Sequence, residues 1–239
     1  MEGHIEETLK KLASVTAEAL IHEAPVSPMH SERAYKEMVA SALLADCFTI
    51  RQRIEQAAAI LTNGLEELAK INGEIHPEEI SLEFAKMTAY FSHQQMHLAE
   101  DKTVQELSGF SEKMSEALYQ AAKLIYEKGL YPDASDAFFF LTLLNSKNSI
   151  FWLALGNCEY FCKRYEPALI AYAFASFMNP CDPFCHIYAS KCYEEIQEVD
   201  NATNSLDLAL FVIDQNSERA GEAIRESVLK EKARLIKKS

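Results

Sequence analysis

Glycine and proline are scarce in this chain, which has seven of each among its 239 residues. Long stretches contain neither, which disfavours a protein of many short strands joined by turns and favours an all-helical one. The N-terminus shows no basic segment followed by an apolar one, so no secretory signal is expected. The longest apolar-rich run, Pro167 to Met178, has about a dozen residues and is shorter than a membrane span. We therefore expect a soluble, cytoplasmic protein with no stable membrane insertion.

Basic charge and catalytic signatures are also lacking. The chain has 23 Lys and Arg against 36 Asp and Glu, a formal net charge of −13, which argues against nucleic acid as the main partner. A glycine-rich phosphate loop, a G-x-S-x-G elbow and a recognisable Cys/His pair are absent from the sequence. We therefore expect no enzymatic activity and no cofactor.

Two groups of residues have the spacing of metal ligands. His93 and His97 lie one helical turn apart, but a third ligand and the Glu of the H-E-x-x-H motif are missing. The pairs Cys158/Cys162 and Cys181/Cys185 have C-x3-C spacing instead of the C-x2-C of zinc knuckles. We interpret the histidines as a solvated helix face and the cysteines as packing residues, and we expect no metal site.

The main signal is an internal repeat. Trp152, Leu155 and Gly156 are followed, at tetratricopeptide spacing, by a further set: Tyr165, Ala168, Tyr172, Ala175 and Pro180. With Ser149 as repeat position 1 and a period of 34 residues, three consecutive repeats follow: 115–148, 149–182 and 183–216. Small residues recur at position 8 (Ala122, Gly156, Ser190) and position 20 (Ala134, Ala168, Ala202), and large apolar ones at position 24 (Phe138, Tyr172, Leu206). Positions 8 and 20 are expected to meet where the two helices of a repeat, A and B, cross.

The turns and the C-terminus agree with this interpretation. Lys128-Gly129-Leu130 and Cys162-Lys163-Arg164 are expected between the A and B helices, with Glu198 replacing the glycine in the third repeat. Asn179-Pro180 should end the second B helix. Residues 217–238 predict one amphipathic helix, with Ala220, Ile224, Val228 and Leu235 on its apolar face. Such a helix would cap the last repeat.

Residues 1–104 have a different pattern, in which three helical segments carry apolar seams. The first seam is Ile5, Leu9, Leu12, Thr16 and Ala19; the second is Leu43, Cys47, Ile50, Ile54, Ala57 and Leu61; the third is Ile80, Phe84, Met87, Phe91, Gln94 and Leu98. Asn63-Gly64 is expected to end the second helix. The seams could pack on one another as a bundle, on the first repeat, or on a second chain in a homodimer; we favour the bundle. A domain boundary is expected at 100–104, before a Thr103/Glu106 capping box that opens the 105–239 repeat domain.

A binding groove is predicted on the A helices. Positions 2, 5, 9 and 12 share one helical face, and seven of the twelve residues at these positions are apolar or aromatic. The candidate groove residues are Tyr119, Lys123, Tyr126, Ile150, Leu153, Asn157, Tyr160, Phe184, Ile187 and Lys191. An apolar face of this kind is expected to be covered by another polypeptide, or else by an N-terminal segment of the same chain.

Residues 110–239 resemble one family in particular. The similarity lies in Tyr131-Pro132-Asp133-Ala134, in Phe151 to Cys158, in Tyr165 to Leu169 and in Asn179 to Cys192. These stretches resemble the class II chaperones of bacterial type III secretion, of the SycD/LcrH type. The resemblance implies three repeats with a C-terminal helix, and a groove that binds an extended, proline-containing segment of a hydrophobic translocator. It also implies that Tyr119, Tyr126 and Tyr131 lie around this groove.

Two classes of function therefore compete. The first is a secretion chaperone that keeps a hydrophobic translocator soluble and secretion-competent. The second is a general repeat adaptor that joins folded regulators or secretion-apparatus subunits. The two are distinguished by the state of the client, because a chaperone keeps an otherwise insoluble protein in solution, whereas an adaptor joins proteins that are already folded.

Overall fold

The computed structural model describes residues 49, 52–70, 78–80, 82–83, 85–86, 102–215 and 219–237. Within these ranges the regular structure is entirely helical, as expected. The chain divides into two compact units, Met1–Gln56 and Ala57–Ser239, and helices α4 to α11 all belong to the second. The described helices include none that is both long and apolar enough to cross a bilayer.

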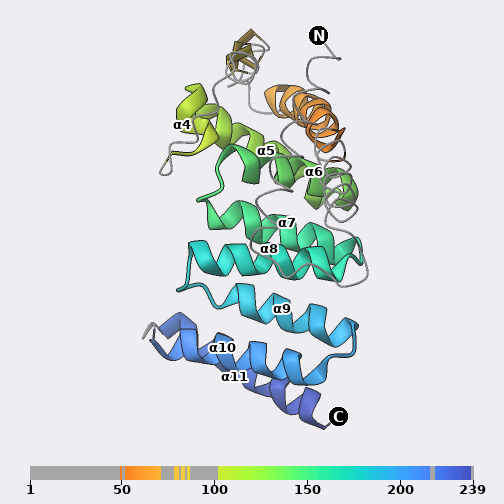
Figure 1. Ribbon diagram of the computed structural model, residues 1–239, viewed down its shortest axis with the longest axis vertical. Coiled ribbons are helices and arrows are strands. Elements are labelled where there is room, and N and C mark those ends of the chain that lie inside the picture. Colours follow the sequence, from red (N-terminus) through yellow and green to blue (C-terminus); the bar gives the residue numbers. More distant parts are fainter. Residues whose placement is uncertain are drawn as a thin grey trace, which may run out of the picture. The chain divides into compact units, whose positions relative to one another are not determined.

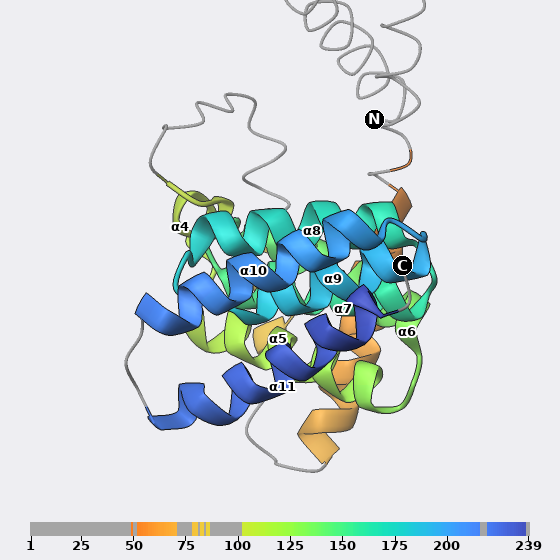
Figure 2. The same cartoon turned by 90° about the horizontal axis from the view of Figure 1, so that it is seen from below.

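The second unit is a stack of antiparallel helices that follow one another in chain order (Figure 1). The helices are α4 (Val104–Ser108), α5 (Glu112–Glu127), α6 (Tyr131–Leu144), α7 (Ser149–Phe161), α8 (Tyr165–Met178), α9 (Phe184–Glu195), α10 (Val199–Gln215) and α11 (Arg219–Ile236). From α5 onwards each helix packs against the next one in the chain. Viewed along the stack, α8 and α10 lie on one side and α5 and α11 on the other (Figure 2).

These helices confirm the repeat pattern. The pairs α5/α6, α7/α8 and α9/α10 are the A and B helices of the three repeats. The second B helix ends at Met178, directly before Asn179-Pro180. The Thr103/Glu106 capping box is also present: the N–H of Glu106 donates to the Thr103 hydroxyl, and the N–H of Thr103 donates to the Glu106 carboxylate.

Close approach of the A and B helices requires the small residues. Ala134, Ala168 and Ala202, all at position 20, are completely buried. A Cβ atom placed on Gly156 would lie 2.5 Å from Cε1 of Tyr172, well inside van der Waals contact. Glycine at position 8 of the second repeat therefore leaves room for the large ring at position 24.

The A-to-B turn has the same backbone in all three repeats. Gly129, Lys163 and Gln197 occupy repeat position 15, with φ values of 77°, 60° and 64°. In each turn the next residue donates its N–H back to the A helix, as in Glu198 to Tyr193 O at 2.8 Å. The expectation that Glu198 replaces the turn glycine is wrong by one residue. The left-handed residue is Gln197, because the third repeat keeps the register of the first.

The C-terminal helix α11 covers the last repeat as predicted. Val228 and Leu235 are buried in a cluster with Leu206 and Ala209 of α10, and Ile224 packs against it. Ion pairs also join the two helices, with Lys232 to Asp207 at 2.5 Å and Arg225 to Asp214 at 2.9 Å. The cap therefore closes the apolar end of the stack.

Residues 57–70, the part of a helix that belongs to the second unit, cover the other end of the stack. Ala57, Leu61 and Leu65 are completely buried, and a Cβ atom on Gly64 would lie 3.1 Å from Cβ of Ala121 on α5. The expectation that Asn63-Gly64 ends this helix is therefore wrong. Gly64 is a contact point between two helices, where the absence of a side chain lets the backbones approach.

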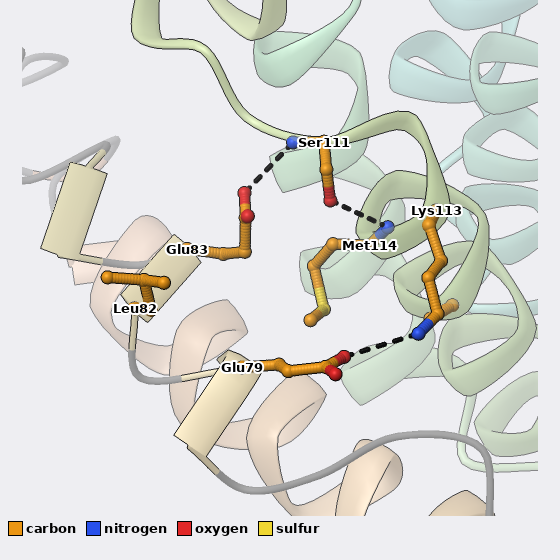
Figure 3. A pocket seen from close by; sticks show the side chains of 7 residues that line it. Glu79, Leu82, Glu83, Ser111, Lys113 and Met114 are labelled. Carbon is orange, nitrogen blue, oxygen red and sulfur yellow. Dashed lines mark hydrogen bonds and ion pairs between the residues drawn. The ribbon is translucent and has the colours of Figure 1, made fainter.

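The described residues 78–80 and 82–83 lie beside the first turn of α5, where a hollow of about 100 Å³ remains (Figure 3). Glu83 is buried and accepts hydrogen bonds from the N–H of Ser111 at 2.9 Å and from Lys86 at 2.6 Å. Glu79 pairs with Lys113 at 3.3 Å. Because Ser111 caps α5, the Glu83 carboxylate satisfies a backbone donor at the positive end of that helix.

Several predictions for the N-terminal region lie outside the described residues. These include the whole first seam, Ile50, Phe84, Met87 and the histidines 93 and 97. Of the described seam residues, Ala57, Leu61 and Ile80 are buried. The domain boundary at 100–104 stays a prediction.

Candidate peptide-binding site

The ten predicted groove residues come from the three A helices, α5, α7 and α9, and the surface that they form is called here the A-helix face. None of the ten side chains is fully buried. Ile150 and Phe184 are 54% and 38% exposed, and Lys123 and Lys191 are exposed as well. The other six, Tyr119, Tyr126, Leu153, Asn157, Tyr160 and Ile187, are half-buried. The face is therefore accessible from solvent and rich in apolar surface.

Four of these residues meet in one hollow of about 140 Å³. They are Tyr126, Asn157, Tyr160 and Lys191, which come from α5, α7 and α9. The remaining lining residues are Phe161, Tyr172 and Tyr188. The other six predicted residues do not line this hollow.

Sequence reasoning missed Phe161 and Tyr188, which stand at repeat positions 13 and 6, and placed Tyr172 only in the core. Tyr188 is tilted towards Tyr172, with ring centroids 5.9 Å apart, and it packs against the core cluster of Ala168 and Cys192. Position 6 follows position 2 by four residues and position 13 follows position 9 by four, so both lie beside the predicted face, and a wider face would have included them.

Aromatic contacts hold one wall of the hollow in place. Tyr131 stacks on Phe161 with ring centroids 4.5 Å apart, and Tyr126 packs edge-on against both rings at 5.3 and 6.0 Å. Tyr160 makes similar contacts with Phe161 and Tyr165, at 5.6 and 5.8 Å. Because these rings support one another, the wall needs little rearrangement to receive a ligand.

The floor of the hollow is polar but carries little charge. The Tyr172 hydroxyl donates to Oδ1 of Asn157 at 2.9 Å, and Nζ of Lys191 lies 5.2 Å from the centroid of the Tyr188 ring. Burial raises the pKa of Tyr126 to about 12, and also raises the pKa values of Tyr160 and Tyr172. These phenols therefore stay protonated at neutral pH, which leaves Lys191 as the one charged group that lines the hollow.

Three of the five described cysteines are packing residues: Cys158, Cys185 and Cys192. Cys162 is half-buried, and Cys181 is exposed, so the packing interpretation is wrong for Cys181. Cys158 and Cys192, both at repeat position 10, are completely buried, and Cys185 is 1% exposed. Burial raises the pKa of Cys158, and raises those of Cys185 and Cys192 to about 12. Protonated, buried thiols are poor nucleophiles and poor metal ligands. Within the described part of the chain, no three Cys, His, Asp or Glu side chains gather as a metal site.

The stacked helix pairs, the left-handed turns and the signature residues together define a tetratricopeptide-repeat protein. No family model matches the chain. The low calcium response locus protein H of Yersinia pestis is 30% identical over 135 residues, which are 56% of this chain and 80% of that protein. The chain therefore belongs to the LcrH/SycD-type family of type III secretion chaperones.

Solved structures agree with this relationship. The Yersinia enterocolitica type III secretion translocator chaperone SycD has 26% sequence identity and a TM-score of 0.52, with 55% of this chain and 97% of SycD covered. SycD in complex with a peptide of the translocator YopD has 27% identity and a TM-score of 0.50, covering 54% of this chain and 98% of SycD. Members of this family are chaperones, which are not enzymatic in kind. The region shared with SycD covers only about half of this chain.

Proposed function

We propose that this chain is a cytoplasmic chaperone that binds an extended segment of a hydrophobic translocator on its A-helix face and keeps the translocator soluble until secretion. The observation that carries the proposal is the convergence of Tyr126, Asn157, Tyr160 and Lys191 in one solvent-accessible hollow. The related chaperone SycD, in complex with a translocator peptide, supports the choice of client.

The hollow suits an extended peptide that carries a spaced apolar side chain. Its aromatic walls, around a hollow of about 140 Å³, would contact one aliphatic side chain or a proline ring. The phenols of Tyr126 and Tyr160 and the ammonium group of Lys191 are donors for the carbonyl groups of an extended backbone. Further along the same face, Ile150 and Leu153 offer apolar surface for a second anchor.

The chemistry of the hollow favours binding over catalysis. A nucleophile or general base needs a pKa near neutrality, yet burial moves the pKa values of Tyr126, Tyr160 and Tyr172 upward, away from it. The same holds for the thiol of Cys158 beneath the face. We therefore propose that the chain has no enzymatic activity.

Isothermal titration calorimetry tests the proposal after the client is identified by co-purification from the source cell. Overlapping synthetic peptides of the client are titrated into the full chain and into Tyr126→Ala and Leu153→Glu variants. Loss of an aromatic anchor at an interface costs about 2 kcal/mol, which corresponds to roughly thirtyfold weaker binding. Leu229→Ala, an exposed change on α11, is the matched control and should bind like the wild type.

Two outcomes would reject the proposal. If both variants bound every client peptide as tightly as the wild type, the A-helix face would not be the client site. If the client stayed soluble when expressed without this chain, and if the chain joined it to a second folded protein, the protein would be an adaptor. A fold check by circular dichroism accompanies both variants, because only binding should change.

A further inference from the structure

The B helices carry an exposed apolar surface that the A-helix face does not use. Repeat positions 22, 26 and 29 share one face of each B helix. At these positions lie six exposed apolar side chains, which we name the B-helix stripe: Leu143, Ile170, Phe174, Phe177, Leu208 and Phe211. Phe177 and Phe211 are 77% and 63% exposed, which is unusual for phenylalanine on a folded protein.

The stripe is a regular feature of the array. Positions 26 and 29 are both exposed and apolar in the second and third repeats, as Phe174/Phe177 and Leu208/Phe211, while in the first repeat Leu143 is exposed and Phe140 is buried. None of the six stripe residues is needed for the A-to-B crossing, which uses positions 8, 20 and 24. Trp152 stacks on Phe174, with ring centroids 4.6 Å apart, and fixes the orientation of that ring from α7. A repeated, partly fixed apolar row of this kind is typical of a docking surface.

The same face is acidic at one end. Position 18 lies one helical turn before position 22, and it is occupied by Glu166 on α8 and by Asp200 on α10, both of which are exposed. Asp136 occupies position 22 on α6. Because the B helices are parallel to one another, these carboxylates gather at the N-terminal end of the stripe. The face therefore combines an apolar middle with a negative end.

We propose that the B-helix stripe binds an amphipathic helix that has basic residues at one end, contributed by the same client that lays an extended segment on the A-helix face. The six side chains expose roughly 600 Å² if a complete aromatic side chain is taken as about 200 Å². That is the largest patch expected on a monomer, but it falls short of the about 800 Å² per partner of a standard dimer interface.

Charge supports a basic helix over a second copy of this chain. Two copies would bring together two bodies of formal charge −13, with the acidic ends of the stripes adding to the repulsion. A helix with basic residues at one end would instead place positive charge beside Glu166 and Asp200 while its apolar face covers Phe177 and Phe211. This inference rests on the proposed function only for the identity of the client.

Fluorescence anisotropy with a designed probe tests the stripe without knowledge of the client. The probe is a labelled 18-residue peptide with leucines on one helical face, glutamines on the other and three lysines at one end. The full chain should bind it saturably. The Phe177→Ser/Phe211→Ser double variant should bind at least tenfold more weakly, and Glu166→Gln/Asp200→Asn should bind severalfold more weakly, with a reduced dependence on salt.

Matched controls separate this site from the A-helix face. Tyr126→Ala should bind the amphipathic probe normally and lose the extended client peptide, while the stripe double variant should do the reverse. A probe with glutamates in place of the lysines should bind more weakly than the basic one. If the extended client peptide does not bind but the amphipathic probe does, the proposed function is rejected and the B-helix stripe remains a binding site. If only the amphipathic probe does not bind, the proposal for the B-helix stripe is rejected.

Three results would overturn the inference. The first is absence of saturable binding of the probe to the wild-type chain. The second is a wild-type dimer in sedimentation velocity that the stripe double variant converts to a monomer, because a second copy would then cover the stripe. The third is hydrogen-exchange protection by the probe on α7 and α9 instead of α8 and α10, a measurement on the wild type that does not depend on the folding of any variant.

Discussion

Gly156→Ala should destabilise the array at the crossing of α7 and α8. The new Cβ atom would lie 2.5 Å from Cε1 and 2.6 Å from Cδ1 of Tyr172, so the ring must move by about 1 Å to reach ordinary contact. Tyr172 is only 2% exposed and is held by its hydrogen bond to Asn157. Overpacking of this kind costs about 1–3 kcal/mol, and a lost hydrogen bond about 1 kcal/mol.

Part of that loss is recovered, because alanine is a better helix former than glycine by about 1 kcal/mol. The net expectation is a loss of about 1–3 kcal/mol in the free energy of unfolding, which lowers Tm by about 2–4 °C per kcal/mol for a domain of this size. Denaturant unfolding followed by circular dichroism measures it. Gly64→Ala is the matched control: its Cβ would lie 3.1 Å from Cβ of Ala121, so its loss should be smaller.

The residues at positions 8 and 24 of the third repeat suggest a double variant that should relieve the clash between position 156 and Tyr172. The third repeat has Ser190 at position 8 and Leu206 at position 24, which is a smaller residue than Tyr172. The Gly156→Ser/Tyr172→Leu double variant should therefore be more stable than the sum of its single changes predicts, by about 1 kcal/mol or more. Additive effects, or a Gly156→Ala variant as stable as the wild type, would refute the packing argument.

Four further predictions concern other parts of the chain. Lys163→Gly should raise the free energy of unfolding by about 0.5–1 kcal/mol, because lysine has a left-handed backbone there, with φ 60°. Gly129→Ala, at the equivalent turn of the first repeat, should lower the free energy of unfolding. Equal stability of Lys163→Gly and the wild type would contradict this. Burial raises the pKa of Glu83, but the hydrogen bonds from Lys86 and Ser111 outweigh this effect, so the pKa of Glu83 is lower in the folded than in the unfolded protein. The Glu83 carboxylate therefore stabilises the fold above about pH 4.5, and this stabilisation is lost as the pH falls through the folded pKa. The difference in unfolding free energy between the wild type and Glu83→Gln, measured by denaturant unfolding, should disappear over that pH range. A chelator should leave Tm unchanged, and stoichiometric zinc in the purified protein would disprove the packing role of the cysteines. Limited proteolysis should cut first at 100–104, and a fragment 105–239 should unfold more easily than 52–239, because it loses the cover of Ala121 on α5.

The repeat array was predictable from sequence because its signals are local and periodic. Small residues at positions 8 and 20, the Asn179-Pro180 stop and the Thr103/Glu106 capping box each have one physical interpretation, and each is confirmed. The family could be recognised for the same reason. Register errors arise where a signal is absent: the third turn has no glycine to mark its left-handed residue, which is Gln197 and not Glu198.

Other features depend on contacts between residues far apart in the chain. Gly64 looks like a helix end in sequence, and only Ala121, on another helix, shows that it is a packing contact. Glu159 looks like an ordinary charged residue, yet it is 4% exposed and is paired with Ser135 and Arg164. Phe161 and Tyr188 lie one helical turn beyond positions 9 and 2, and only the packing of α5, α7 and α9 around one hollow shows that the site extends to them.

The position of Tyr172 links client binding to the stability of the middle repeat. Its ring fills the crossing opposite Gly156, and its edge and hydroxyl form the floor of the hollow on the A-helix face. A client that contacts this floor adds its binding free energy to the folded state, by RT ln(1 + [L]/Kd). Amide exchange in α7 and α8 should consequently slow with client concentration more than exchange in α11, whose cluster with α10 does not include Tyr172. Occupied chaperone would then resist local opening at its centre, while its C-terminal cap continued to fray as in the free protein.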